Sequence, residues 1–473
     1  MQQRDAIGRP RRAHFSGIGG TAMVAGARLA IEAGWEVRGS DNPLYPPTSV
    51  MVEQLGVPAA TAYDEANLDW DPDLVVIGNA LSRGNSEVEA VLERKLHYVS
   101  LPEWLKDNVL RARQPVVVTG THGKTTTTAM ASYLLDQAGL EPGFLIGGQP
   151  LDFAHSARLG AEGAPFVIEG DEYDTAFFDK RAKFFHYLPE IAVVTSVEFD
   201  HGDIYRDVEE IELAFQRMLR QIPQSGWLLA CADDPRAADL TNHAFSRTAT
   251  YGFADDAEWR GEYEVRGDGR VGLTVFREGA RWAELQVPLA GRHNLENALA
   301  AVAVAGVLGV APAALEQAMP AFRGVRRRME VFLEAEGVTF IDDFAHHPTA
   351  MRETIAAARM RWPGRRLWVL FEPRSNTVVT NRFQNEIADA LAAADQVWIG
   401  PVYRADRVAV EQRLDRDALT HGSPSARYTE DVEEIVQDVT ARAREDDVVL
   451  ILSNGAFEGI YDQFRSQFEH GNP

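Results

Sequence analysis

The chain of 473 residues contains a single cysteine, Cys231, and only five lysines. One cysteine excludes an intramolecular disulfide and a cysteine metal cluster, so Cys231 is interpreted as a small buried apolar residue. No apolar run approaches the ~20 residues of a membrane span, and no apolar stretch follows the basic N-terminal residues as it would in a secretory leader. These absences predict a cytoplasmic protein without a membrane partner.

Positive charge is also in short supply. The chain has 47 Lys and Arg against 70 Asp and Glu, a formal net charge of −23. Such a balance argues against a non-specific nucleic-acid binder, and anionic ligands would need local positive sites and metal ions. Hydrophobic residues make up 45% and charged residues 25%, which is ample for folded cores, and the length predicts about three domains.

The most informative stretch runs from Gln114 to Leu140. The apolar run 115–118 predicts a buried strand, and apolar spacing from Ala129 predicts a helix that Gly139 ends. The turn between them is Gly120-Thr121-His122-Gly123-Lys124-Thr125-Thr126. Glycine N–H groups and a helix N-terminus suit phosphate, Lys124 can reach the β- and γ-phosphates, and Thr125 can offer a hydroxyl to Mg²⁺. Because Val118 stands where the strict P-loop pattern has glycine, a glycine-rich turn with an incidental lysine is the alternative.

A second glycine turn lies near the start of the chain. A predicted strand at 13–16 leads into Gly17-Ile18-Gly19-Gly20, then a helix to Gly34, a strand at 35–38 and Asp41. In such a βαβ unit the turn faces a diphosphate and the acidic residue faces a ribose hydroxyl. The incomplete glycine pattern leaves a nicotinamide-cofactor site as an alternative. A buried strand is also predicted at 74–77, and 111–113 looks like a polar linker.

Acidic and imidazole groups follow two further predicted strands. Glu169 comes after the strand at 166–168, and His201 follows the strand at 191–195. Ligands of open α/β sheets sit at the carboxyl ends of the strands, so these side chains suit Mg²⁺ held beside a nucleotide. Taken singly, each would more often be solvated or structural, but their shared position after apolar strands favours the metal interpretation.

The last third of the chain predicts another α/β unit. The segment 291–297 precedes an alanine-rich helix, and its Asn294 and Asn297 are read either as a helix cap and a surface residue or as nucleotide-base contacts. The segment 324–329 marks a boundary. Strands at 338–341, 367–371, 396–399 and 448–452 alternate with helices, which favours a parallel sheet.

Seven motifs occur in one order: GIGGTAM, GTHGKTTT, EGDEYD, EFDHGD, GRHNLENA, GVRRRME and DDFAHHPTA. In this combination the chain resembles the Mur ligase family, ATP-dependent enzymes that build the peptide of bacterial cell-wall precursors. The resemblance implies three α/β domains: a Rossmann-like domain for a UDP-sugar (1–112), a central P-loop ATPase domain with a mostly parallel sheet (113–323), and a Rossmann-like C-terminal domain (324–473) that serves the peptide and closes over the nucleotide.

The resemblance also implies roles for individual residues. The UDP part would be held by Gly17, Gly19, Gly20 and Asp41. The ATP phosphates would be held by Gly120, Thr121, His122, Gly123, Lys124, Thr125 and Thr126. Other nucleotide contacts would come from Asn294, Asn297, Arg328 and Asp343. Mg²⁺ would be held by Thr125, Glu169 and His201. Lys124, Glu169 and His201 would be catalytic, whereas His346 and Arg374 would bind the amine substrate. Apart from the resemblance, Arg382 is either a second cationic anchor for a peptide with several carboxylates or a solvent-exposed residue at a helix start.

The implied reaction joins UDP-N-acetylmuramate to the tripeptide L-alanyl-γ-D-glutamyl-meso-diaminopimelate, as in peptidoglycan recycling, through an acyl phosphate. L-Alanine is the alternative amine, and an ATPase that drives motion is the rival class. Some relatives use a carbamylated lysine as a metal ligand, but no lysine follows Lys183 here. We expect a monomer or a weak homo-oligomer.

Overall fold

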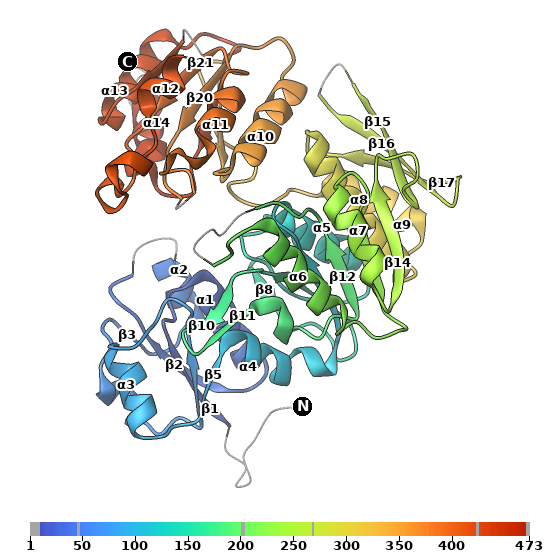
Figure 1. The fold of residues 1–473 in the computed structure, drawn as a ribbon, viewed down its shortest axis with the longest axis vertical. Helices are drawn as coiled ribbons and strands as arrows, with labels where there is room; N and C mark the ends of the chain where they lie inside the picture. Colours follow the sequence, from blue (N-terminus) through green and yellow to red (C-terminus); the bar gives the residue numbers. More distant parts are fainter. Residues whose placement is uncertain are drawn as a thin grey trace. The chain divides into compact units, whose positions relative to one another are not determined.

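The structure is a computed structural model that describes residues 10–44, 48–199, 204–266, 269–375, 377–421 and 425–469 (Figure 1). The chain divides into two compact units. One comprises residues 1–262, 274–283 and 296–323, and the other comprises residues 263–273, 284–295 and 324–473. Among the described residues no helix has the length and apolar character needed to cross a membrane.

The N-terminal part is a five-stranded parallel sheet in the order β3-β2-β1-β4-β5. Its central strands are buried along nearly their whole length because helices cover both faces of a parallel sheet. Its helices and strands are β1 Arg12–Ser16, α1 Thr21–Glu32, β2 Glu36–Ser40, α2 Thr48–Leu55, β3 Ala59–Ala60, β4 Leu74–Ile77, α3 Ser86–Glu93, β5 Tyr98–Ser100 and α4 Leu101–Asn108. Helix α4 begins with a capping box in which Ser100 and Glu103 satisfy each other's backbone N–H groups.

The central sheet has the order β17-β16-β15-β14-β13-β12-β6-β9-β7-β8. Strand β6 lies between β12 and β9, parallel to both. The helices and strands are β6 Gln114–Thr119, α5 Lys124–Gln137, β7 Gly143–Leu145, β8 Ala157–Arg158, β9 Pro165–Gly170, β10 Asp174–Ala176, β11 Asp179–Ala182, β12 Ile191–Val194, α6 Val208–Leu219, β13 Trp227–Cys231, α7 Pro235–Asp239, β14 Arg247–Gly252, β15 Trp259–Val265, β16 Val271–Arg277, β17 Ala280–Val287, α8 Arg292–Val307 and α9 Pro312–Ala318. Cys231 is 3% exposed at the end of β13, and burial raises its pKa to about 12, so its interpretation as a buried residue is confirmed.

The C-terminal sheet has the order β18-β19-β23-β20-β21-β22. Its pairs are parallel as predicted, except that β18 is antiparallel to β19. Alternate residues of one strand enter different cores, as Trp368 and Val369 of β20 do. The helices and strands are β18 Glu330–Ala335, β19 Val338–Asp343, α10 Pro348–Arg361, β20 Leu367–Phe371, α11 Gln384–Leu391, β21 Gln396–Ile399, α12 Arg416–His421, β22 Ala426–Tyr428, α13 Val432–Arg442, β23 Val448–Leu452 and α14 Ile460–Glu469. The α/β class with three mostly parallel sheets is thereby confirmed.

Several element limits differ from the sequence predictions. Helix α8 begins at Arg292, so Asn294 and Asn297 lie inside the helix and are buried, and the reading of Asn297 as a surface residue is wrong. The segment 111–113 is not a simple linker, because Leu110–Ala112 forms a 3-10 turn and Arg113 donates to the carbonyls of Val109, Leu159 and Gly160.

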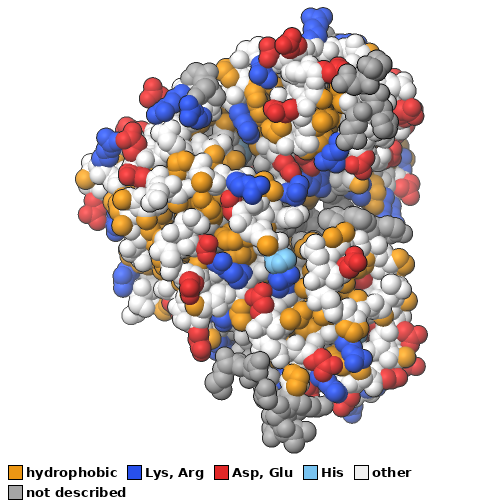
Figure 2. All heavy atoms as spheres, turned by 180° about the vertical axis from the view of Figure 1, so that it is seen from behind, with side chains coloured by type: hydrophobic (Ala, Val, Ile, Leu, Met, Phe, Trp, Pro, Cys, Tyr) orange, Lys and Arg blue, Asp and Glu red, His pale blue; other side chains and the backbone are white. Residues whose placement is uncertain are grey.

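Charge on the surface is mixed. Figure 2 shows Lys and Arg side chains interspersed with Asp and Glu over one face of the molecule. On the face shown, the net charge of −23 is therefore not gathered into one large acidic patch. A surface of this kind gives no sign of a broad electrostatic footprint for a polyanion.

Candidate active site

The turn Gly120–Gly123 follows β6, and its glycines are required by the backbone. Gly120 and Gly123 have φ of +122° and +81°, in the left-handed region. A Cβ on Gly120 would lie 2.3 Å from Thr195 Oγ1, and one on Gly123 would lie 2.4 Å from Asn297 Oδ1. The turn is thus pressed between the residue after β12 and helix α8.

Helix α5 begins directly at Lys124, five residues before the apolar spacing starts at Ala129. Threonines occupy its first turns, and Thr126, Thr127 and Thr128 are buried. The hydrophobic pattern could not reveal this start because these buried side chains are polar. Thr127 Oγ1 donates to Asn297 Oδ1 at 3.1 Å, which ties α5 to α8.

The Lys124 side chain forms an ion pair at the carboxyl ends of strands β6 and β9. Its Nζ lies 2.8 Å from Glu172 Oε2 and 2.7 Å from the Gly120 carbonyl oxygen. Burial disfavours the ammonium group, but Glu172, Asp171 and Glu169 outweigh that cost and raise the pKa of Lys124. The side chain therefore carries a positive charge beside the turn, which is the charge that a phosphate group would meet.

Glu169, at the end of β9, lies beside Thr125. Thr125 Oγ1 donates to Glu169 Oε2 at 3.0 Å, and the Gly147 N–H donates to Oε1. Burial, followed by the neighbouring Asp171, raises the pKa of Glu169 to about 7. A carboxylate with this proton affinity gains from a nearby cation, and the two oxygen donors are of the kind that Mg²⁺ prefers.

Two acidic residues of the same strand end were not singled out from the sequence. Glu172 is 3% exposed and pairs with Lys124, and Asp171 pairs with Lys183 Nζ at 3.2 Å. The neighbouring Lys124 and Lys183 lower the pKa of Asp171 against the effect of burial. A sequence signal was available, because Asp171 and Glu172 stand with Glu169 in the motif EGDEYD and two of the five lysines, Lys180 and Lys183, follow closely.

The other side of the turn faces the segment after β12. His122 Nε2 lies 3.2 Å from Glu198 Oε2, and the His122 N–H donates to Ser196 Oγ at 3.0 Å. Thr121 Oγ1 accepts from the Glu198 N–H at 2.8 Å. His201, predicted as a metal ligand, lies outside the described residues.

In the N-terminal part, the turn Gly17–Gly20 follows the central strand β1. The N–H groups of Gly17 and Ile18 donate to the Ser40 carbonyl oxygen, and the Gly19 N–H donates to Asp41 Oδ2 at 2.8 Å. Tyr63 also donates to Asp41, at 2.8 Å. Asp41 therefore braces the glycine turn in this structure, and its role toward a ribose stays a prediction.

A buried carboxylate supports this first turn from helix α3. Glu87 is fully buried and accepts from Ser16 Oγ at 2.6 Å, Ser40 Oγ at 2.5 Å and Asn67 Nδ2 at 2.7 Å. Burial raises the pKa of Glu87, but hydrogen bonds from His14 and these three groups bring it down to about 2. Glu87 was not predicted, because one acid in a helix has no distinctive pattern.

Two residues predicted as nucleotide contacts, Arg328 and Asp343, lie in the C-terminal part, and Asp343 is buried. Asp343 belongs to β19 rather than following it; its carboxylate accepts from the N–H groups of Met329 and Ala345, and burial raises its pKa. The Arg328 guanidinium lies 5.1 Å from the Phe344 ring centroid. The Asp343 carboxylate thus fixes the backbone at Met329 and Ala345, and its role toward a nucleotide stays a prediction.

The predicted amine-binding residues lie on two neighbouring loops. Arg374 stacks on Tyr403, 3.9 Å from its ring centroid, and its Nη1 lies 3.2 Å from Glu372 Oε1. Ser375 Oγ donates to the His346 carbonyl oxygen at 3.4 Å, which brings the His346 loop to the Arg374 loop. Arg382 is exposed on the 3-10 turn Asn381–Phe383.

Asn294, predicted as a nucleotide contact, donates to the Ala290 carbonyl oxygen from within α8.

Three family models cover most of the chain. Residues 12–113 match the model described as Mur ligase family, catalytic domain, residues 118–305 match the Mur ligase middle domain, and residues 327–455 match the Mur ligase, glutamate ligase domain. The chain belongs to the Mur ligase family of ATP-dependent ligases.

Individual relatives compare the chain with two kinds of Mur ligase. The chain is 40% identical over 468 residues to UDP-N-acetylmuramate–L-alanyl-γ-D-glutamyl-meso-2,6-diaminoheptandioate ligase of Escherichia coli (strain K12), covering 96% of this chain and 97% of the relative. It is 34% identical over 457 residues to UDP-N-acetylmuramate–L-alanine ligase of Burkholderia thailandensis, covering 94% and 96%. The crystal structure of a murein peptide ligase from Psychrobacter arcticus superposes with a TM-score of 0.72 at 35% identity, covering 97% and 99%.

Proposed function

We propose that this chain joins the lactyl carboxylate of UDP-N-acetylmuramate to the amino group of L-alanyl-γ-D-glutamyl-meso-diaminopimelate, with ATP converted to ADP and phosphate. The observation that carries the proposal is the cluster of Lys124, Glu172, Glu169 and Thr125 at the turn after β6. The greater identity to the tripeptide ligase than to the L-alanine ligase supports the choice of amine.

The first step brings two anions together. A carboxylate oxygen of the muramate attacks the γ-phosphorus, the bond from that phosphorus to the bridging oxygen of ADP breaks, and an acyl phosphate forms. Lys124 offsets the repulsion between the carboxylate and the phosphate. It also stabilises the negative charge that develops on the transferring phosphoryl group. The first N–H groups of α5, which begins at Lys124, would orient the phosphates.

The site also fits Mg²⁺, since Thr125 and Glu169 present neighbouring oxygen atoms and Glu169 gains from a cation. Thr125 and Glu169 would hold the ion, and His201 stays the predicted third ligand. When bound, Mg²⁺ would neutralise phosphate charge. Asp171, paired with Lys183, would keep the acidic strand end fixed while Glu169 accepts the cation.

The second step needs the amine beside the activated carboxyl group. The amine nitrogen attacks the acyl carbon, the bond from that carbon to the phosphate oxygen breaks, and the amine loses a proton. A tripeptide carries three carboxylates against one for L-alanine, so it requires more cationic contacts. Arg374, fixed on Tyr403, is the proposed anchor for one of these carboxylates, and Arg382 is a second candidate.

Phosphate release measured with defined substrates tests the proposal. We expect turnover only when UDP-N-acetylmuramate and an amine are both present, with kcat/KM higher for the tripeptide than for L-alanine. Arg374→Ala should lower kcat/KM for the tripeptide ~10²-fold, the scale of a lost charge-assisted contact. Turnover with ATP alone would favour the rival ATPase class, a preference for L-alanine would overturn the choice of amine, and an unaffected Arg374→Ala would reject only the anchor.

A further inference from the structure

A short hairpin of the central part reaches the N-terminal sheet, which belongs to the same compact unit. Strands β10 and β11 pair antiparallel with Ala176 opposite Asp179, so Phe177 and Phe178 form the turn between them. Both residues are partly buried against an apolar cluster of the N-terminal part. Two-residue hairpin turns favour glycine, asparagine and aspartate. Two phenylalanines in this turn therefore indicate that burial, rather than turn propensity, accounts for the residue types.

The base of the hairpin is fixed to the acidic end of strand β9. The Lys183 N–H donates to the Tyr173 carbonyl oxygen at 3.2 Å. The Lys183 Nζ lies 3.2 Å from Asp171 Oδ2 and 3.9 Å from the Tyr173 ring centroid. The hairpin therefore leaves directly from the strand end that carries Glu169 and Glu172.

The tip of the hairpin packs beside strand β5 (Figure 1). The rings of Phe178 and Tyr98 meet edge to face with centroids 5.1 Å apart, and Phe177 meets Phe178 in the same way at 5.1 Å. Aromatic pairs in this arrangement are favourable beyond the area that they bury. Contacts of this kind hold the tip in one place against the N-terminal sheet.

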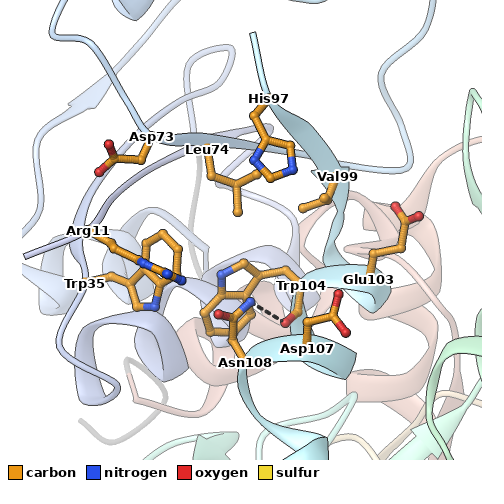
Figure 3. A pocket seen from close by; sticks show the side chains of 10 residues that line it. All are labelled: Arg11, Trp35, Asp73, Leu74, His97, Val99, Glu103, Trp104, Asp107 and Asn108. Atoms are coloured by element: carbon orange, nitrogen blue, oxygen red, sulfur yellow. Dashed lines mark hydrogen bonds between the residues drawn. The ribbon is translucent and has the colours of Figure 1, made fainter. Parts of the chain in front are cut away.

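Helix α4 contacts the hairpin from a second direction. Figure 3 shows the Glu103 side chain extending away from the Trp104 ring. One Glu103 carboxylate oxygen lies within 4.8 Å of a carboxylate oxygen of Asp179 and a ring nitrogen of His186. Asp179 also accepts from Arg181 Nη2 at 2.6 Å, so a guanidinium offsets the repulsion between the two carboxylates. Polar as well as apolar contacts thus join the hairpin to the N-terminal part.

The apolar cluster under the tip supports two residues predicted to hold the UDP-sugar. The cluster contains the buried Leu81, and Tyr63 packs against it. A Cβ on Gly17 would lie 3.7 Å from Leu81 Cδ1, and the Tyr63 hydroxyl donates to Asp41 at 2.8 Å. A shift of the cluster would therefore move the first glycine turn and Asp41 together.

We propose that Phe177 and Phe178 are positioning residues that align the bound UDP-sugar with the γ-phosphate, an inference that rests on the proposed function. The base of the hairpin stands at the acidic strand end beside Lys124, and its tip supports the first glycine turn. A well-packed hairpin thus fixes the distance between the two sites. The first step depends on that distance, because a misplacement of about 1 Å can lower a rate ~10²-fold. Neither ring has to touch a substrate for this effect.

Phe178→Ala tests the proposal through binding, catalysis and stability measured separately. Calorimetric titration without ATP should give a Kd for UDP-N-acetylmuramate ~10-fold weaker than wild type, whereas the Kd for ADP with Mg²⁺ should not change. The kcat at saturating substrate concentrations, corrected for the folded fraction, should fall ~10-fold. A purely structural role would lower the unfolding temperature but leave Kd and kcat unchanged in the folded protein, and that result would overturn the proposal.

Three further variants sharpen the test. Phe178→Tyr keeps the ring and should retain the wild-type Kd and kcat. Phe245→Ala, which removes a phenylalanine that is 65% exposed, is the matched control and should behave as wild type. Tyr98→Ala removes the partner ring, so its combination with Phe178→Ala should lower kcat by less than the product of the two single losses.

The outcomes separate this inference from the proposed function. Equal weakening of ADP and UDP-N-acetylmuramate binding in Phe178→Ala would indicate general damage to the fold and would reject the positioning role. A wild-type chain that binds UDP-N-acetylmuramate but does not ligate it would refute the proposed function, whereas the comparison of Kd values would still decide whether the hairpin supports the UDP-sugar site.

Discussion

Each of the two glycine turns follows a strand of a parallel sheet, but the carboxylates beside the two turns differ in how fully their charge is compensated. Gly17–Gly20 follows the central strand of its sheet, and Gly120–Gly123 follows a strand flanked by parallel neighbours. At the first turn Glu87 has a pKa of about 2 because its hydrogen bonds are complete. At the second turn Glu169 has a pKa of about 7 because burial and Asp171 leave its charge poorly compensated.

The difference separates a carboxylate that serves the fold from one that is available to a ligand. Scaffold donors already satisfy Glu87, so a further cation would gain little there. On the proposed function, Glu169 and the Lys124–Glu172 pair would instead respond to added charge, since a cation would lower the pKa of Glu169 and a phosphate would replace Glu172 beside Lys124. Four substitutions test this contrast, from the largest expected effect on ligation to the smallest.

Lys124→Ala should lower the rate of ligation at least ~10³-fold, because it removes the ammonium group held beside the Gly120–Gly123 turn. The variant should still fold, with a lower unfolding temperature because the buried Glu172 loses its partner. Phosphate release and thermal unfolding measure the two effects. Lys95→Ala, an exposed lysine, is the control, and a tenth of wild-type ligation retained by Lys124→Ala would contradict the role.

Glu169→Gln should lower kcat ~10²-fold, with partial recovery at high Mg²⁺ concentration, because the amide can still accept from the Gly147 N–H but binds a cation weakly. Stability should not fall, since a poorly compensated buried charge is removed. A titration of kcat against Mg²⁺ measures the effect. Glu162→Gln, an exposed acid, should behave as wild type, and an Mg²⁺ dependence unchanged in Glu169→Gln would argue against the assignment.

Glu172→Gln should lower kcat/KM for ATP ~10-fold, because Lys124 loses its carboxylate partner and is less firmly placed at the turn. The loss should be smaller than that of Lys124→Ala, since the ammonium group itself remains. Steady-state kinetics with ATP varied measure it. If both variants lost ligation equally, Glu172 would itself have to act on the reacting groups.

Glu87→Gln should leave kcat unchanged and lower the free energy of unfolding by about 3 kcal/mol at pH 7, the linkage expected for a pKa lowered from 4.5 to about 2. A lowered folded-state pKa gives stability that is present above pH ~4.5 and lost as the pH falls toward 2. The difference between Glu87→Gln and wild type should therefore shrink below pH ~4.5. Urea denaturation at several pH values measures it; a pH-independent difference would refute the charge argument.

The sequence was most informative where chemistry and backbone coincide. The strands around the two glycine turns were predictable because parallel strands buried on both faces are continuous apolar runs, such as Leu74–Ile77 in the first sheet and Ile191–Val194 in the second. The glycines were predictable because a tight turn needs them. Sites supplied by strand ends were also predictable in outline, since parallel neighbours bring their carboxyl ends to one edge.

Other features depended on contacts that sequence spacing does not encode. The start of α5 was hidden because its buried residues are threonines, and the burial of Asn297 depends on α8 packing against Gly123. Glu87 became recognisable only when Ser16, Ser40 and Asn67 were seen to converge on it.

The buried Cys231 makes this chain convenient for site-specific labelling. Its thiol is 3% exposed and its pKa is about 12, so almost none of it is thiolate near neutral pH, and a maleimide should not react with the folded protein. Cysteines introduced at exposed positions, one in each compact unit, would then be the reactive thiols without any background substitution. Donor and acceptor dyes attached there would report the distance between the two units as nucleotide and substrates are added.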